Sequence, residues 1–158
     1  MDRRLFLFTL LAACGPVGAI GTRYQLVVLR HADRDPEDLV LNARGEARAA
    51  ALPAALDGVP IDAIYLPDLE RNRQTAAPLA AARGIEPRAV DTLPGFASRL
   101  LTGNEGRSIV WIGNSTNLSQ MWQELDAPGG PPTGYGEIVV LRGRGPGSFS
   151  ATPLRYDP

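Results

Sequence analysis

The stretch Leu26-Val27-Val28-Leu29-Arg30-His31-Ala32-Asp33 decides how the rest of the chain is interpreted. It places an arginine and the only histidine of the chain directly after four apolar residues. Such an apolar run is typical of a strand that is buried on both faces of a parallel sheet. Ligand groups gather where parallel strands end, so Arg30 and His31 are predicted to line a phosphate site with histidine as the nucleophile.

The composition indicates one globular domain. The chain has 158 residues, of which 44% are hydrophobic and 21% are charged, so it can bury a core of its own. A formal net charge of -1 gives no reason to expect binding of nucleic acid or of an anionic membrane through a basic face. One histidine, one cysteine and no dense carboxylate cluster argue against a metal site, and no cofactor is expected.

Strand-length apolar runs alternate with helical patterns along 24–158, which is taken as the folded domain. The expected strands are 24–29, 61–66, 108–112, 137–141 and 149–154, and the expected helices are 42–56, 69–83 and about 118–125. This alternation predicts an α/β fold, a three-layer α/β/α sandwich with a mainly parallel sheet. The loop 127–136, rich in proline and glycine, is expected to border the site.

The N-terminal segment has the pattern of an export signal. Asp2-Arg3-Arg4 precedes an apolar stretch that is too short to span a bilayer, and Arg3-Arg4 resembles a twin-arginine signal. Leu11-Ala12-Ala13-Cys14 resembles the lipobox of bacterial lipoproteins. That resemblance implies a signal peptide at 1–13, lipid on Cys14 and a tether at 14–23, which would anchor the protein to a membrane facing the periplasm or cell exterior. The alternative is cleavage after Val17-Gly18-Ala19, which would release a soluble periplasmic protein.

Three motifs in order resemble those of the histidine phosphatase superfamily, the branch with phosphoglycerate mutase-like proteins and phosphohistidine phosphatases. They are Leu29-Arg30-His31-Ala32, then Asn42-Ala43-Arg44-Gly45-Glu46-Ala47-Arg48-Ala49, then the segment 64–76, where Arg71 precedes Gln74-Thr75-Ala76. The similarity runs from about Tyr24 to the C-terminus. It implies the three-layer fold described above and hydrolysis of a small phosphomonoester.

The resemblance also implies roles for single residues. His31 would attack phosphorus, and Arg30 and Arg71 would hold the phosphoryl oxygens. Arg34 and Arg73 are each as well explained by a solvated charge as by a substrate contact. The family uses a carboxylic acid to protonate the leaving group, and its position varies. The candidates for this proton donor are Asp91, Glu105 and Asp33.

Asn114 departs from the family pattern. In Ile112-Gly113-Asn114-Ser115 it takes the place of a second histidine that contacts the transferring phosphoryl group. Its amide can donate a hydrogen bond but carries no charge, and loss of such a donor costs ~2.7 to 4 kcal/mol in the transition state. A slow phosphatase is therefore expected. One alternative is an inactive pseudophosphatase that binds a phosphorylated or anionic ligand or a protein partner. Another is a structural envelope lipoprotein that keeps only the fold.

Overall fold

The computed structural model describes residues 23–158. The expected signal peptide, Cys14 and the tether up to residue 22 lie outside the described residues. Within 23–158, no helix is both long enough and apolar enough to cross a membrane.

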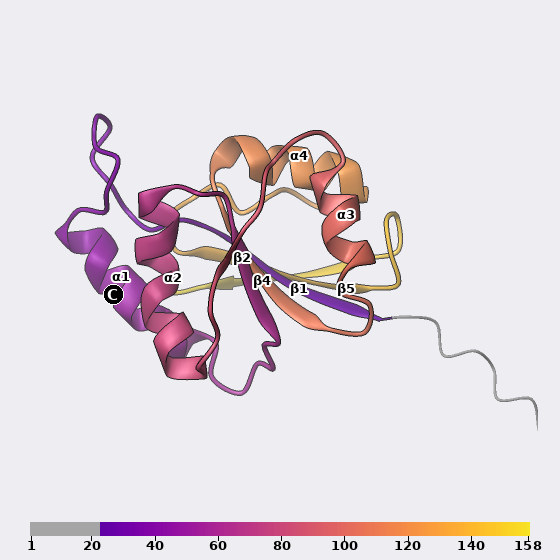
Figure 1. Cartoon of the computed structure of the whole chain (residues 1–158), viewed down its shortest axis with the longest axis horizontal. Helices are drawn as coiled ribbons and strands as arrows, with labels where there is room; N and C mark the ends of the chain where they lie inside the picture. The colour runs from indigo at the N-terminus through magenta and orange to yellow at the C-terminus, as the bar shows by residue number, and fades with distance from the viewer. Residues whose placement is uncertain (1–22) are drawn as a thin grey trace, which may run out of the picture.

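Strands and helices alternate along the described chain (Figure 1). In order they are β1 (Tyr24–Arg30), α1 (Ala43–Ala55), β2 (Ala63–Leu66), α2 (Glu70–Arg83), β3 (Arg88–Ala89), α3 (Phe96–Thr102), β4 (Ser108–Gly113), α4 (Ser115–Leu125), β5 (Glu137–Gly143) and β6 (Ser150–Arg155).

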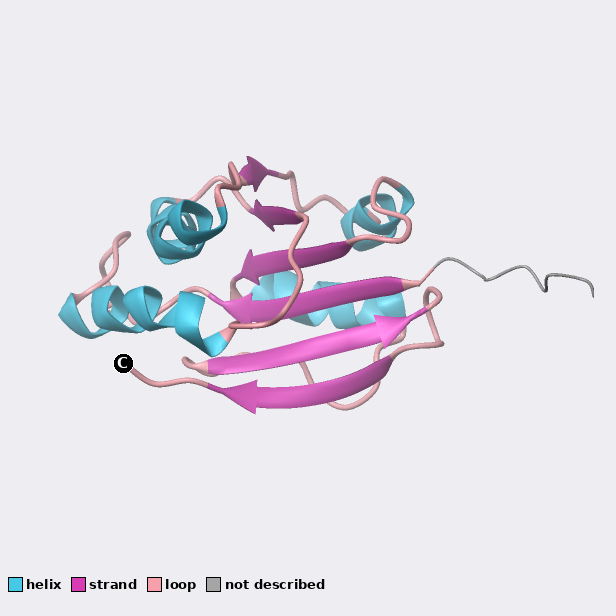
Figure 2. Cartoon of the chain, turned by 90° about the horizontal axis from the view of Figure 1, so that it is seen from below, coloured by secondary structure: helices cyan, strands magenta, loops and turns pink. Residues whose placement is uncertain are grey.

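The strands form one sheet in the order β3-β2-β4-β1-β5-β6, in which they lie side by side (Figure 2). The pairs β3–β2, β2–β4 and β4–β1 are parallel, whereas β5 runs antiparallel to both β1 and β6. This confirms the expected mainly parallel sheet. It also places the carboxyl ends of β1 and β4 next to each other, because Arg30 pairs with Gly113.

Helices cover both faces of the sheet, which makes the three layers (Figure 1). Alternate residues of each strand point to opposite faces. Val28 and Trp111 pack with side chains of α3 and α4, such as Phe96 and Met121. The neighbouring strand residues 27 and 110 pack instead with α1 and α2. The central strands are therefore buried on both sides, as the uninterrupted apolar run predicts.

Two elements, β3 and α3, were not predicted from the sequence. β3 has only two residues, both exposed, so no apolar pattern marks it. α3 has seven residues and begins after Gly95, whose φ of 81° lies in the left-handed region that glycine favours. The start of α4 also differs, since it begins at Ser115 and not near residue 118.

Candidate functional site

The site lies where β1 and β4 end. The backbone N–H of His31 donates a 2.9 Å hydrogen bond to the carbonyl oxygen of Gly113, which extends the parallel pairing by one residue. Gly113 has no room for a side chain, because a Cβ there would lie 2.3 Å from the Oδ1 atom of Asn117. The two segments that carry the sequence motifs are thereby held at one point of the sheet.

A pocket of about 510 Å³ opens at this point. It is lined by side chains from β1, α2 and α4, from the loops that adjoin β1 and α4, and from the loop between β3 and α3. The lining residues are Arg30, His31, Arg34, Arg71, Thr92, Asn114, Ser115, Thr116, Asn117 and Gln120. Three of these are arginines and none is a carboxylate. The pocket is therefore suited to an anion, and the structure brings five residues predicted from the sequence to it.

His31 is held as a neutral imidazole. Its Nδ1 lies 2.8 Å from the carbonyl oxygen of Ala32, and since a carbonyl only accepts, Nδ1 carries the hydrogen and Nε2 keeps its lone pair. Burial, together with the positive charges of Arg30, Arg71 and Arg34, lowers the pKa of His31 to about 4. The side chain is thus uncharged at neutral pH, which is the form that a nucleophile requires.

The arginines of the pocket are incompletely satisfied. The Nε atoms of Arg30, Arg34 and Arg71 are buried and have no hydrogen-bond partner among the described residues. Burial lowers the pKa of Arg71, and the nearby charges of Arg34 and Arg30 lower it further. Because buried donors without partners are costly, three of them around one pocket indicate that an oxyanion belongs there.

Arg30 is positioned by the loop that the sequence predicts to border the site. Its guanidinium donates a 2.8 Å hydrogen bond to the carbonyl oxygen of Thr133, and its Cζ lies 4.4 Å from the centre of the Tyr135 ring. The same ring lies 5.9 Å from the imidazole of His31, centre to centre. Tyr135 therefore packs against both members of the first motif, a role that no sequence pattern indicates.

The second motif supports the pocket from behind. Thr75 accepts a 2.9 Å hydrogen bond from the backbone N–H of Ala32 and donates one of 2.8 Å to the carbonyl of Arg71. The amide of Asn72 donates to the carbonyl oxygens of Ile112 and Gly113 at 2.8 and 3.1 Å. These two buried side chains hold α2 against the ends of β1 and β4. They therefore fix the position of the Arg71 backbone, from which its side chain reaches the pocket.

Asn114 caps α4 at the rim of the pocket. Its side-chain oxygen accepts from the backbone N–H groups of Thr116 and Asn117, both at 3.1 Å. Asn117 returns the bond by accepting from the N–H of Asn114 at 2.9 Å, so a full capping box forms. The oxygen of Asn114 is thus occupied by the helix, and only its amide nitrogen remains to contact an anion. The N-terminus of α4 adds a partial positive charge at the same place.

The structure separates the three carboxylates that were candidate proton donors. Asp33 pairs with the buried Arg48 at 2.5 Å and does not line the pocket. Glu105 precedes β4 and helps to raise the pKa of Tyr24, at the start of β1, so it belongs to the opposite end of the sheet. Neither position suits a proton donor. Asp91 is exposed and directly precedes Thr92, which lines the pocket, so it alone stays near the rim.

Arg73 also lies outside the pocket lining. It forms an exposed ion pair with Asp68 from the outer side of α2, where 47% of its side chain is exposed. Among residues 23–158, no group of three or more His, Cys, Asp or Glu side chains is arranged to hold a metal ion.

Taken as a class, the molecule is a three-layer α/β protein with a cationic pocket around a neutral histidine. The family model of the histidine phosphatase superfamily, branch 1, matches residues 26–137, and the chain belongs to this superfamily. No curated protein matches the chain.

Several solved phosphatases share this fold. The protein histidine phosphatase SixA, complexed with tungstate, aligns with a TM-score of 0.67 and 19% identity over 83% of this chain and 96% of its own. A mycobacterial glucosyl-3-phosphoglycerate phosphatase in complex with inorganic phosphate aligns with a TM-score of 0.63 and 18% identity, over 85% of this chain and 97% of its own. A phosphoserine phosphatase from Entamoeba histolytica, in complex with 3-phosphoglyceric acid, aligns with a TM-score of 0.64 and 18% identity, over 84% of this chain and 97% of its own. The family and these neighbours support a phosphatase-type enzyme.

The lowered pKa of His31 predicts a loss of stability in mild acid. An unfolded chain binds a proton at the ordinary pKa of 6.5, whereas the folded chain does so only near pH 4. Between these values the unfolded state binds more protons, so the free energy of unfolding decreases as the pH falls from 6.5 to 4, by about 3 kcal/mol in total.

Urea denaturation at pH 7, 5.5 and 4.5 measures this effect. The same series on His31→Ala is the control, because it retains every other titrating group. We expect the wild-type stability to fall more steeply with pH than that of the variant. Parallel pH profiles for the two proteins would show that His31 does not titrate in this way.

Proposed function

We propose that the protein is a slow, extracytoplasmic phosphatase that hydrolyses a small phosphomonoester through a phosphohistidine on His31. One observation carries the proposal. The free Nε2 of a neutral His31 shares a pocket with three arginines whose buried Nε atoms have no partner among the described residues. Tetrahedral phosphate presents the oxygens that such donors require.

In the first step, the Nε2 lone pair of His31 forms a bond to phosphorus, and the ester P–O bond breaks. The leaving oxygen takes the electron pair of that bond. Arg30, Arg34 and Arg71 stabilise the negative charge on the non-bridging oxygens as the phosphoryl group is transferred. The hydrogen bond from Nδ1 to the Ala32 carbonyl keeps the imidazole in line and stabilises the positive charge that develops on the ring.

In the second step, water attacks phosphorus, and the Nε2–P bond breaks. Inorganic phosphate leaves, one proton of the attacking water passes to bulk solvent, and His31 returns to its neutral form. Because burial and three positive charges disfavour a cationic ring, the phosphorylated imidazole is a good leaving group in this pocket.

The pocket favours substrates whose leaving group needs little protonation. Among the described residues, no carboxylate lines it, and of the three candidate donors only Asp91 lies next to a lining residue, Thr92. An alkoxide must be protonated as it leaves, whereas a phenolate departs readily without an acid. We therefore expect aryl phosphates to be hydrolysed much faster than alkyl phosphates.

The extracytoplasmic location rests on the N-terminal residue pattern. Leu11-Ala12-Ala13-Cys14 resembles a lipobox, and a lipid on Cys14 would tether the domain to a membrane. Metabolic labelling with a fatty acid tests this, since the wild type is expected to incorporate label and Cys14→Ser is not. Equal labelling of the two proteins, or none, would contradict the anchor.

Asn114 favours a second candidate function, that of a pseudophosphatase. With its oxygen bound in the cap of α4, Asn114 offers one neutral donor where the family has a histidine. A pocket with the arginines in place but without that charge can bind a phosphorylated ligand and release it unchanged. Tungstate or vanadate binding without turnover would identify this function.

Restoring the histidine distinguishes the two functions. In Asn114→His we expect the rate of aryl phosphate hydrolysis to rise by about a hundredfold to a thousandfold, because a preorganised donor is worth that much in the transition state. Initial rates at saturating substrate measure the gain. The Asn114→Ser variant is the control, since serine also caps a helix but adds no charge.

A large gain from a low rate that depends on His31 supports the slow phosphatase. Absence of turnover in both the wild type and Asn114→His, combined with tight tungstate binding, would assign the pocket to the pseudophosphatase function instead.

A further inference from the structure

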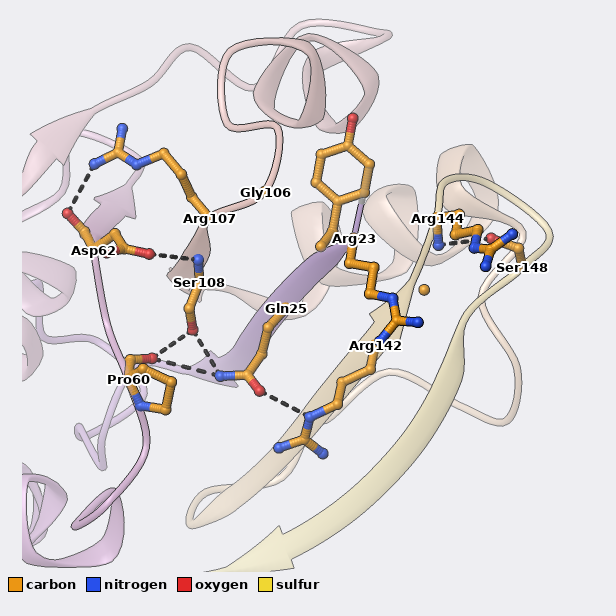
Figure 3. Close-up of a pocket in the computed structure, with 12 residues that line it drawn as sticks. Arg23, Gln25, Pro60, Asp62, Gly106, Arg107, Ser108, Arg142, Arg144 and Ser148 are labelled. Carbon is orange, nitrogen blue, oxygen red and sulfur yellow. Dashed lines mark hydrogen bonds between the residues drawn. The ribbon is translucent and has the colours of Figure 1, made fainter. Parts of the chain in front are cut away.

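A second pocket, of about 660 Å³, lies at the opposite end of the sheet (Figure 3). It is formed where β1 and β4 begin, where β5 ends and in the turn between β5 and β6. Since β1 has seven residues, this pocket is separated from His31 by about 20 Å of strand. It is not part of the phosphatase site.

Four arginines line this pocket against one carboxylate, that of Asp62. We call the four the arginine face, which consists of Arg23, Arg107, Arg142 and Arg144. Figure 3 shows Arg23, Arg142 and Arg144 on one side and Arg107 on the other. Among the described residues, none of the four forms an ion pair.

Hydrogen bonds fix part of this arrangement. Gln25 lies opposite Arg142 in the paired strands, and its oxygen accepts from the Nε of Arg142 at 2.8 Å. The amide nitrogen of the same side chain donates to the Ser108 hydroxyl at 2.7 Å. Arg142 is therefore held at its Nε, and its two terminal nitrogens are left for a ligand.

Clustered guanidinium groups without carboxylate partners repel one another, and an anionic partner removes that cost. Arg23, Arg142 and Arg144 are all exposed, as suits contact with an extended surface more than capture of an enclosed small molecule. The partner is therefore expected to be a broad anionic surface.

The position of the arginine face in the sequence indicates that the anionic surface is a membrane. Arg23 is where the N-terminal segment joins the domain, and Cys14 is nine residues earlier. Nine extended residues span about 30 Å at most, so a lipid on Cys14 would keep the arginine face close to the bilayer. The active-site pocket, at the other end of the sheet, would then open away from the membrane.

We propose that the arginine face docks on anionic phospholipid headgroups and so orients the phosphatase pocket toward solvent. The inference rests on the proposed lipid anchor for its biological setting. The docking itself is a property of residues 23–148 and is testable without lipidation.

The test uses the full chain with Cys14→Ser and measures its partition onto vesicles of phosphatidylcholine alone or with 30% phosphatidylglycerol, about the charge density of an anionic membrane. The variant Arg23→Gln/Arg142→Gln/Arg144→Gln removes three charges from the face. The matched control is Arg73→Gln/Arg88→Gln/Arg155→Gln, which removes three exposed arginines that line neither this pocket nor the site. The signal segment, with Arg3 and Arg4, is identical in all three proteins.

We expect the Cys14→Ser chain with its four arginines intact to bind anionic vesicles much more strongly than neutral ones. This preference should decrease with added salt. The face variant should lose about fivefold in partition per arginine, or about a hundredfold in total, and the control much less. The face variant should hydrolyse a soluble aryl phosphate at an unchanged rate.

Equal losses in the two triple variants would attribute binding to net charge and overturn the proposal. No preference for anionic vesicles would also overturn it. If the face instead binds free phosphate and the face variant alone loses that binding, the face is a small-anion site. A chain that shows the vesicle preference but takes up no fatty acid in cells would contradict the anchor and leave the docking in place. Absence of turnover would contradict only the phosphatase function.

Discussion

Hydrolysis of an aryl phosphate is expected to fall to the uncatalysed background when His31 is replaced by alanine. The change removes the only histidine of the chain. In the proposed mechanism, its Nε2 is the atom that accepts the phosphoryl group. Loss of the nucleophile in an enzyme that forms a covalent intermediate costs about a millionfold in kcat, so the measured loss will be limited by the sensitivity of the assay. Initial rates with p-nitrophenyl phosphate measure it.

Tungstate binding provides the control for folding and for the pocket. The His31→Ala variant keeps Arg30, Arg34 and Arg71, so it should still bind the oxyanion. The double variant Asn114→His/His31→Ala should also be inactive, because a histidine at the N-cap of α4 cannot replace the nucleophile that follows β1. Turnover that survives in either variant would contradict the mechanism.

Replacing Arg71 with alanine is expected to lower kcat/KM by about a hundredfold to a thousandfold. Arg71 lines the pocket, and its buried Nε has no partner among the described residues. In the proposed function, phosphate oxygens accept from this guanidinium. Arg73→Ala is a closely matched control. It removes the same side chain from the same helix, but Arg73 pairs with Asp68 outside the pocket and should have almost no effect on rate.

The weakened binding of Arg71→Ala should also be seen with tungstate, measured by calorimetry. Equal rates for Arg71→Ala and Arg73→Ala would show that Arg71 does not contact the transferring group. A large loss in Arg73→Ala would show that the substrate contacts Arg73, outside the pocket around His31.

The layers of the fold were predictable because the central strands carry long apolar runs. The stretch 26–29 is buried on both faces of the sheet, and no amphipathic surface strand shows that pattern. β3 was not predictable, since its two exposed residues pair with β2 through the backbone alone. The same holds for the seven-residue α3, whose buried Phe96 and Leu100 give too short a pattern to recognise.

The site was predictable where the chemistry is carried by a motif beside a strand end. Arg30, His31, Arg71 and Asn114 all line one pocket. The residues that position these side chains could not be predicted in the same way. Tyr135 contacts Arg30 from a loop far along the chain, and no local pattern marks such a contact.

The proton donor could not be assigned from the sequence because spacing does not show which end of the sheet a loop occupies. Asp33 follows the first motif directly, yet its carboxylate turns toward Arg48 in α1. Glu105 lies between the right elements, but at the wrong end of β4.

Transfer of phosphate to His31 can be detected directly by labelling. The wild-type chain is mixed with ³²P-labelled aryl phosphate, quenched in alkali during turnover, and analysed for labelled amino acids. Since the chain has a single histidine, any phosphohistidine found is on His31. We expect acid-labile, alkali-stable label on histidine that disappears when unlabelled substrate is added before the quench. Turnover with no labelled histidine would contradict transfer to His31.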